Sequence, residues 1–262
     1  MERRAFVQAS VAGLCGAAVG QGAAAAAEGK PIMRELYEHR IYSVKPDKLP
    51  IMDAWLSKAL LPTLKRLGLG PVGVFIDAEN PEFTRLHVLI VHPSGETVGT
   101  LSARLASDDE YTKAAADFLA IRAADPAYLR VESSLLAAID GMPKLAVPDT
   151  GKPRLLNLRI YESHNERAGL KKIEMFNKGE LAIFQRTGLK PVFFAETIVG
   201  SAMPNLTYLL VFPDEDARKA AWDKFRVDPE WLKLKAMPEY VDKEIVSKIA
   251  NKILTPTSYS QI

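Results

Sequence analysis

The chain has 262 residues, with 34 Lys or Arg against 32 Asp or Glu, which gives a formal net charge of +2 at pH 7. This balance argues against a nucleic-acid partner, because a duplex-binding surface needs a concentrated basic face. The single cysteine, Cys15, excludes a disulfide within the chain and a metal site built from several thiolates.

Residues 1–27 have the features of a secretory signal peptide. Arg3 and Arg4 form a basic start, an apolar stretch of small residues follows over 11–19, and the alanines of 23–27 offer a cleavage site. The two arginines resemble the twin-arginine motif. Because the residue before them is neither Ser nor Thr, general secretion stays open as the route. We expect export to a bacterial periplasm.

Residues 34–141 are predicted to form a first module. Apolar residues at helical spacing follow Pro46-Asp47 as far as Leu64, and Pro62 should kink the last turn of that helix. Asn80-Pro81 is typical of a hairpin turn. We predict strands over 35–42, 71–77, 85–92 and 130–139, and helices over 46–64, 96–105 and 111–128, the last an addition to the module.

Residues 142–153 contain three prolines and one glycine and are predicted to be a linker. A second module should follow over 154–262. We predict its strands over 155–161, 191–198, 206–212 and 243–254, and its helices over 170–186 and 214–225. Asp214 suits the N-cap of the second of these helices. No segment after residue 27 has the uninterrupted apolar length that spans a bilayer, so we expect no transmembrane span in the mature chain.

The two modules resemble each other at a spacing of about 120 residues. The matching segments are 40–42 with 159–161, 68–72 with 188–192, and 86–93 with 206–213. The register then holds through Asp108 and Asp228, and chance similarity rarely keeps register over such a length. Each module reads β-α-β-β-α-β, which is the ferredoxin-like order. We therefore predict an α+β fold in which two tandem ferredoxin-like modules pair their antiparallel sheets as an intramolecular α/β barrel.

Alternation along the first strand of each module divides its side chains between two faces. We expect the more apolar set to lie under the helices: Tyr37, His39 and Ile41 with Leu156, Leu158 and Ile160. The polar set should then line the face that the modules share: Glu38, Arg40 and Tyr42 with Asn157, Arg159 and Tyr161. These six residues are candidate ligand-binding positions in the barrel.

The two arginines differ in their expected partners. Glu38 can neutralise Arg40 from two residues away, whereas Arg159 has only the neutral Asn157 beside it. One interpretation is a structural network that fixes the two sheets against each other. The other is that Arg159 keeps spare donors for an anionic or carbonyl group of a small ligand, with hydroxyls from the two tyrosines.

His87 is the histidine of most interest, because it lies on a middle strand where the second module has Thr207. It is more simply a hydrogen-bonded sheet residue than a ligand of haem or metal, since a metal site needs several convergent ligands. We predict no metal site and no cofactor. Haem would be bound only under the alternative hypothesis of a haem-handling enzyme. The catalytic residues, if there are any, are not identifiable from the sequence.

The opening of the first module, Tyr37-Glu38-His39-Arg40-Ile41-Tyr42 followed by Pro46-Asp47-Lys48, resembles the start of NIPSNAP proteins. The segments 228–231 (DPEW) and 254–260 (LTPTSYS) are similar to the end of their second helix and to their C-terminal tail. Asp47 departs from the usual glycine. The resemblance implies tandem NIPSNAP domains with a ferredoxin-like α/β barrel of the dimeric α/β-barrel superfamily, and it implies a fold more than a reaction.

Three functions are consistent with these patterns. The first is an exported NIPSNAP-type protein without catalysis that binds a small molecule between its modules. The alternative is an α/β-barrel oxygenase or haem-handling enzyme for a hydrophobic substrate, with His87 or a tyrosine assisting proton transfer. The third is an adaptor that assembles through the helix at 111–128. A homo-oligomer is left open in each case.

Overall fold

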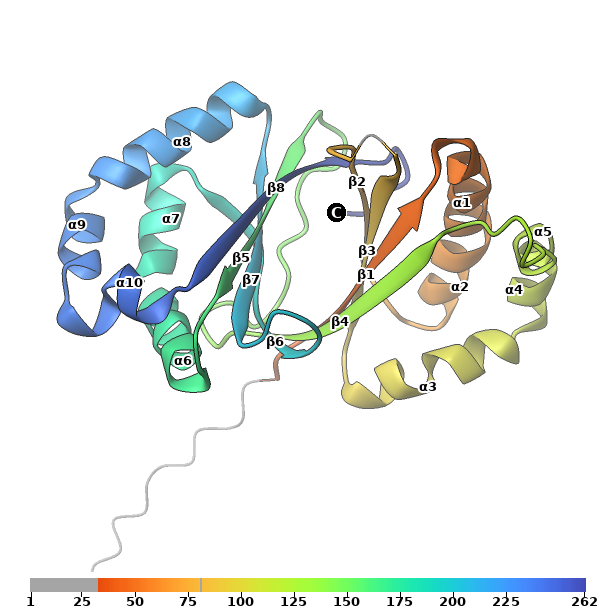
Figure 1. Ribbon diagram of the computed structural model, residues 1–262, viewed down its shortest axis with the longest axis horizontal. Helices are drawn as coiled ribbons and strands as arrows, with labels where there is room; N and C mark the ends of the chain where they lie inside the picture. The colour runs from red at the N-terminus through yellow and green to blue at the C-terminus, as the bar shows by residue number, and fades with distance from the viewer. Residues whose placement is uncertain (1–32, 81) are drawn as a thin grey trace, which may run out of the picture. The chain divides into compact units, whose positions relative to one another are not determined.

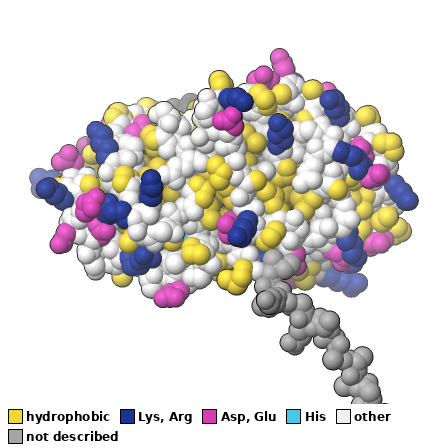
Figure 2. Space-filling view, turned by 180° about the vertical axis from the view of Figure 1, so that it is seen from behind, with side chains coloured by type: hydrophobic (Ala, Val, Ile, Leu, Met, Phe, Trp, Pro, Cys, Tyr) yellow, Lys and Arg dark blue, Asp and Glu magenta, His cyan; other side chains and the backbone are white. Residues whose placement is uncertain are grey.

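The structure, a computed structural model, describes residues 33–80 and 82–262. The predicted signal peptide and Pro81 of the predicted turn lie outside these residues. Among the residues described, no helix is both long enough and apolar enough to cross a membrane. On the face shown in Figure 2, basic and acidic side chains are interspersed.

The first module follows the predicted order of elements. Its strands are β1 (Leu36–Val44), β2 (Val72–Asp77), β3 (Thr84–His92) and β4 (Arg130–Ala138). Its first helical segment is η1 (Pro46–Lys48), α1 (Leu49–Trp55), the π-helical turn η2 (Leu56–Leu60) and α2 (Leu61–Arg66). Its second is α3 (Gly95–Ala106), α4 (Asp109–Ala114) and α5 (Ala116–Leu119). The predicted helix over 111–128 is therefore wrong in extent, because α5 ends at Leu119.

The second module has the same order. Its strands are β5 (Leu155–Glu162), β6 (Lys190–Val199), β7 (Asn205–Phe212) and β8 (Lys248–Pro256). Its first helical segment is α6 (Glu166–Met175), the π-helical turn η3 (Phe176–Glu180) and α7 (Leu181–Thr187). Its second is α8 (Glu215–Val227), α9 (Pro229–Lys235), η4 (Pro238–Tyr240) and α10 (Asp242–Ile245). Asp214 caps α8 by accepting from Ala217 N, as predicted.

The eight strands form one closed barrel in the order β1-β3-β2-β8-β5-β7-β6-β4. Each module contributes four neighbouring strands, and all the pairings between them are antiparallel. The helices of the first module lie on one side of the barrel and those of the second module on the opposite side (Figure 1). The predicted fold class is confirmed.

Two junctions join the modules. β4 pairs with β6 from Leu135 opposite Val199 to Ala138 opposite Ala195. β8 pairs with β2 only at its end, and the segment after β8 extends this junction, since Gln261 exchanges hydrogen bonds with the main chain of Val72 at 2.8 and 3.0 Å. Both junctions are hydrogen-bonded through the backbone, so the two sheets form one closed barrel without a free strand edge.

A π-helical turn interrupts the first helix of each module at the equivalent place, Leu56–Leu60 and Phe176–Glu180. Pro62 follows the first of these turns, but the equivalent residue of the second module is Ala182. The proline is therefore not the cause of the irregularity, although we expected a kink there. A π turn displaces the residues on either side of it and is often found at functional positions.

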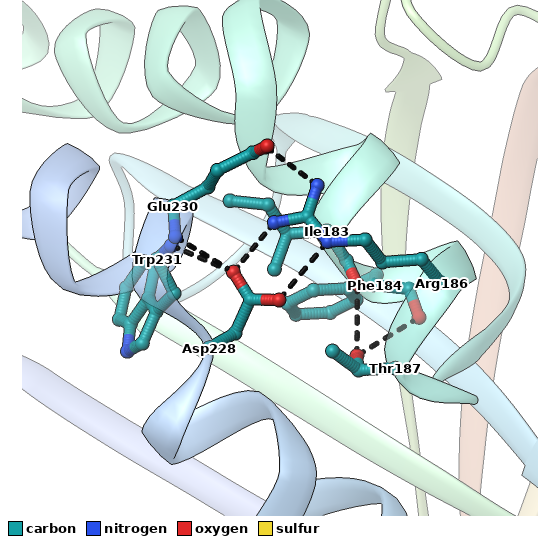
Figure 3. A network of polar contacts seen from close by, with 7 residues as sticks. All are labelled: Ile183, Phe184, Arg186, Thr187, Asp228, Glu230 and Trp231. Carbon is teal, nitrogen blue, oxygen red and sulfur yellow. Dashed lines mark hydrogen bonds and ion pairs between the residues drawn. The ribbon is translucent and has the colours of Figure 1, made fainter.

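An arginine at the end of the first helix anchors the second helical segment in both modules. Arg186 holds Asp228, with Nε 3.0 Å from Oδ2, and also reaches Glu230 (Figure 3). Asp228 in turn caps α9 by accepting from the main-chain N–H groups of Glu230 and Trp231. Arg66 binds Asp108 and Glu110 in the same way in the first module. The shared register of these acidic residues therefore has a structural explanation.

Candidate functional site

The polar residues of β1 and β5 do not line the barrel, and this corrects the expectation from alternation. The interior is filled by an apolar cluster that includes Tyr37 of β1 and Leu156 and Leu158 of β5. Tyr42 and Tyr161 instead belong to the clusters under the helices of their own modules. Of the seven residues proposed as barrel lining, His87 lies inside, where it contacts His39. The other six, Glu38, Arg40, Tyr42, Asn157, Arg159 and Tyr161, lie on the helix face.

The reason is that both faces of each sheet are buried, one by helices and one by the other sheet. The closed interior offers no route to solvent, so it takes the apolar set. A long side chain on the helix face can bury its methylene groups and carry its charge to the edge of the helix layer. Arg40 does this, since its side chain is 17% exposed and its partner Glu38 is 12% exposed.

The barrel interior is packed. Among the pockets found in the described residues, one lies in the barrel interior. It has a volume of about 10 Å³ and is lined by His39 and six apolar side chains. Such a volume holds about one water molecule. A small molecule between the two modules, as first expected, has no room in this arrangement, and neither has a haem.

His39 and His87 form a buried pair within this interior. His39 Nε2 lies 2.9 Å from His87 Nδ1, and the rings are stacked with centroids 5.1 Å apart. Burial lowers the pKa of His39 to about 4, and burial together with His39 lowers the pKa of His87. Both imidazoles are therefore neutral at pH 7. His87 Nε2 is buried and has no hydrogen-bond partner among the residues that the structure describes. Within residues 33–80 and 82–262, no group of three or more His, Cys, Asp or Glu side chains is placed to hold a metal ion.

In the first module, the guanidinium of Arg40 pairs with the carboxylate of Glu38 under the helices. Glu38 accepts from Arg40 Nε at 2.6 Å and lies 3.3 Å from His92 Nε2. Burial raises the pKa of Glu38, but hydrogen bonds from His92 and Arg40 outweigh it and lower that pKa to about 2. Tyr42 packs edge-on against Trp55 and Tyr128. These contacts lie within the first module, so they are not the network between the two sheets that one interpretation expected.

In the second module, Arg159 has no carboxylate of this kind. Asn157 donates to Asn251 at 2.8 Å and accepts from Trp222 Nε1 at 3.3 Å, so it is turned away from the guanidinium. Arg159 stacks on Trp222 of α8, with its central carbon 4.5 Å from the ring centroid. Within the described part of the chain, its Nη1 makes a long contact of 3.4 Å to Asn251, and its Nε is buried without a hydrogen-bond partner. Arg40 thus has a carboxylate partner at 2.6 Å and Arg159 has only a long contact to an amide, which is the difference that the sequence predicted.

A pair of tyrosine hydroxyls lies beneath Arg159. Tyr208 donates to or accepts from Tyr161, with the two oxygens 2.8 Å apart. Burial and the neighbouring Tyr161 raise the pKa of Tyr208 well above its ordinary value. Burial disfavours the charge on Arg159, but the nearby hydroxyls of Tyr208 and Tyr161 outweigh this and raise the pKa of Arg159. The guanidinium is therefore a permanent cation beside these hydroxyls.

An ion pair that the sequence did not suggest completes this cluster. Lys172 of α6 lies with Nζ 3.1 Å from Glu180 Oε2 at the end of the π turn, and both side chains are 2% exposed. Lys172 is also surrounded by aromatic rings, with Phe176 at 5.0 Å and Tyr161 at 5.3 Å. Burial opposes the charge on Lys172, but Glu180 outweighs it and raises the pKa of Lys172.

The first module has apolar residues at the equivalent positions. Counted from the π turns, Lys172 corresponds to Met52 and Glu180 to Leu60. Tyr208 lies opposite Arg159 as Val88 lies opposite Arg40. Met52, Leu60 and Val88 are all fully buried. The cluster of Arg159, Tyr161, Tyr208, Lys172 and Glu180, here called the second-module polar cluster, is therefore a local feature of one half of the barrel.

Comparison with known proteins bears on the same half. Residues 156–261 match the family model described as NIPSNAP. Over these residues the second module is similar to NIPSNAP domains. Its match spans β5 to the segment after β8 and includes every residue of the second-module polar cluster. No curated protein matches the chain.

Solved structures resemble both modules together. A proposed monooxygenase from Fusobacterium nucleatum subsp. nucleatum is 10% identical, with 85% of this chain and 92% of that chain covered and a TM-score of 0.55. A second proposed monooxygenase, from Lactobacillus acidophilus, is 11% identical, with 85% and 94% covered and a TM-score of 0.55. A NIPSNAP-like domain protein from Burkholderia xenovorans is 20% identical, with 41% and 88% covered and a TM-score of 0.37. The first two likenesses show the fold of the whole barrel.

Proposed function

We propose that this chain is an exported binding protein for a small molecule with an anionic or carbonyl group, and that Arg159 of the NIPSNAP domain holds that group. The observation that carries the proposal is the contrast between the two arginines. Arg40 is neutralised by Glu38 at 2.6 Å, whereas Arg159 Nε is buried without a partner. Burying an N–H group of a cation without an acceptor costs free energy. A ligand that accepts a hydrogen bond from this N–H group removes that cost.

The surroundings of Arg159 suit such a ligand. Trp222 provides a flat apolar face on which the guanidinium is already oriented, at 4.5 Å. The hydroxyl pair of Tyr161 and Tyr208 offers a further donor beneath it. These features favour a site between β5 and α8 over the packed barrel interior.

Two further parts of the proposal come from the sequence. The basic start, apolar stretch and alanine-rich end of residues 1–27 support export to a periplasm, by the twin-arginine or the general route. The identical order of elements in the two modules supports the first module as a second, divergent NIPSNAP domain.

The test is native mass spectrometry of the protein isolated from its own periplasm, followed by titration with benzoate as a model anion while tryptophan fluorescence is recorded. We expect a retained small molecule, and quenching that is lost when Trp222 is replaced by Phe. Arg159→Gln should weaken benzoate binding roughly tenfold to a hundredfold, since a hydrogen bond to a charged group contributes about 1.5–3 kcal/mol.

Arg40→Gln is the matched control, because it removes the equivalent guanidinium of the other module. It should leave benzoate binding unchanged. Equal binding by the parent chain and Arg159→Gln would reject the assignment of the site. No retained molecule together with no benzoate response would reject the binding function.

The alternative is an oxygenase acting on a hydrophobic substrate. Its support is the likeness over both modules to two structures described as proposed monooxygenases. Dioxygen uptake with a quinol-like substrate, and visible absorbance with and without added haem, would distinguish it. Turnover would favour the oxygenase, and ligand binding without turnover would favour the binding protein.

A further inference from the structure

A groove lies at the end of the barrel where the connection between the modules passes the ends of β6 and β7. Its volume is about 340 Å³, within the range of small-molecule sites. The apolar part of its wall comes from three prolines and from Val211 and Phe212 of β7. The polar part comes from Asp149 and three basic side chains, Lys152, Arg154 and Lys190.

The groove carries more positive than negative charge. Lys152 is paired with Asp149 at 3.1 Å. Asp149 also attracts Arg154, whereas Lys190 has no ion pair among the residues that the structure describes. Two cations therefore face a wall that is otherwise largely apolar, and their attraction for an anion is stronger beside apolar surface than in open water.

Arg154 is held in place by two main-chain oxygens, one of which belongs to Ile262, the last residue of the sequence. Its Nη1 donates to the main-chain oxygen of Thr150 at 3.2 Å, and its Nη2 donates to the main-chain oxygen of Ile262 at 2.7 Å. Its Nε is buried and has no partner. A guanidinium has five N–H donors, so three remain after these two bonds. The planar fork is oriented in advance, which lowers the entropy lost when it binds a carboxylate.

We propose that this groove binds a small organic anion with a flat apolar body, such as an aromatic carboxylate. The carboxylate would lie between Arg154 and Lys190, and the ring would lie on the prolines and Val211. The site is separate from Arg159, so it does not depend on the function proposed above.

The experiment is a calorimetric titration of the full chain with 2-naphthoate, with sulfate as the anion without an apolar body and 2-naphthalenemethanol as the apolar body without charge. We expect binding of 2-naphthoate at least tenfold tighter than of either control compound. Lys190→Ser should weaken it about tenfold, which corresponds to about 1.4 kcal/mol. Lys190 is exposed, so this variant should fold, whereas Arg154 variants also lose the contact to Ile262.

Lys233→Ser, which removes an exposed lysine of α9, is the matched control and should bind 2-naphthoate as the parent chain does. Equal binding by Lys190→Ser and the parent would overturn the inference, as would equal binding of the alcohol and the carboxylate. Loss of binding in Arg159→Gln with none in Lys190→Ser would also overturn it. That last result would place the anion at Arg159 and leave the proposed function standing, so the two failures are distinguishable.

Discussion

Replacing Lys172 alone by Met should destabilise the protein far more than replacing Lys172 and Glu180 together by Met and Leu. The two side chains are 2% exposed and form an ion pair at 3.1 Å. The single change leaves a carboxylate in apolar surroundings without its cation. The double change installs the residues that Met52 and Leu60 already provide at the equivalent, fully buried positions of the first module.

The magnitudes follow from the burial of both groups. Breaking a buried ion pair by removing one partner costs about 3–5 kcal/mol, whereas exchanging both for apolar residues of similar volume is about neutral, or stabilising by ~1–4 kcal/mol. For a folded unit of this size, each kcal/mol lowers Tm by roughly 2–4 °C. The single variant should therefore melt roughly 6–20 °C below the parent. Asp242, at 3.6 Å from Lys172, adds little because its side chain is 56% exposed.

Equilibrium denaturation in urea at pH 7 of the parent, both single variants and the double variant gives the coupling energy. Burial raises the pKa of Glu180, and Lys172 only partly offsets this. Without Lys172 the folded state binds a proton more readily than the unfolded state. The deficit of Lys172→Met should therefore shrink as the pH falls from 7 toward 5.

Moving the pair is the matched control. Met52→Lys with Leu60→Glu places it in the first module, where Val88 stands in place of Tyr208, and should be destabilising. A Lys172→Met variant within about 1 kcal/mol of the parent would refute the reasoning. So would a double variant that is as unstable as the single one.

Three other predictions concern pH and a helix cap. Burial lowers the pKa of His39 to about 4. The free energy of unfolding should therefore be full above pH 6.5 and fall by up to about 3 kcal/mol as the pH drops to 4. Urea denaturation should find this loss absent in the double variant His39→Leu with His87→Leu. Burial raises the pKa of Glu38, but its hydrogen-bonding partners outweigh this and lower the pKa to about 2. Thermal melts should therefore show stability lost between pH 4.5 and 2 in the parent and not in Glu38→Gln. Asp228→Ala removes the cap of α9 and should cost about 0.5–2 kcal/mol in thermal melts, whereas Glu230→Ala should be near neutral.

Much of the fold could be predicted from the sequence because each strand is a short β-rich run beside a turn. Residues 85–92 predicted β3, which spans Thr84–His92, and 206–212 predicted β7, which spans Asn205–Phe212. The order of elements then gave the ferredoxin-like topology and its closure. Alternation could separate the two faces of β1 and β5 but could not say which face was which, because both are buried.

The candidate site was only partly predictable. The contrast between Glu38 and Asn157 two residues before each arginine indicated that Arg159 would lack a carboxylate, and it does. Lys172 and Glu180 were missed because they are eight residues apart, a spacing that a regular α-helix does not bring onto neighbouring positions. The π turn brings them together. The available signal was that both stand where the other module has an apolar residue.

The covalent join between the halves has a consequence for how this barrel can vary. In an assembly of two identical subunits, every substitution is present in both subunits. A buried charge that serves a function in one subunit therefore also lowers the stability of the other. A single chain is free of that constraint. One half can keep apolar residues under its helices, as the first module does at Met52, Leu60 and Val88, while the other accepts a buried ion pair such as Lys172 with Glu180.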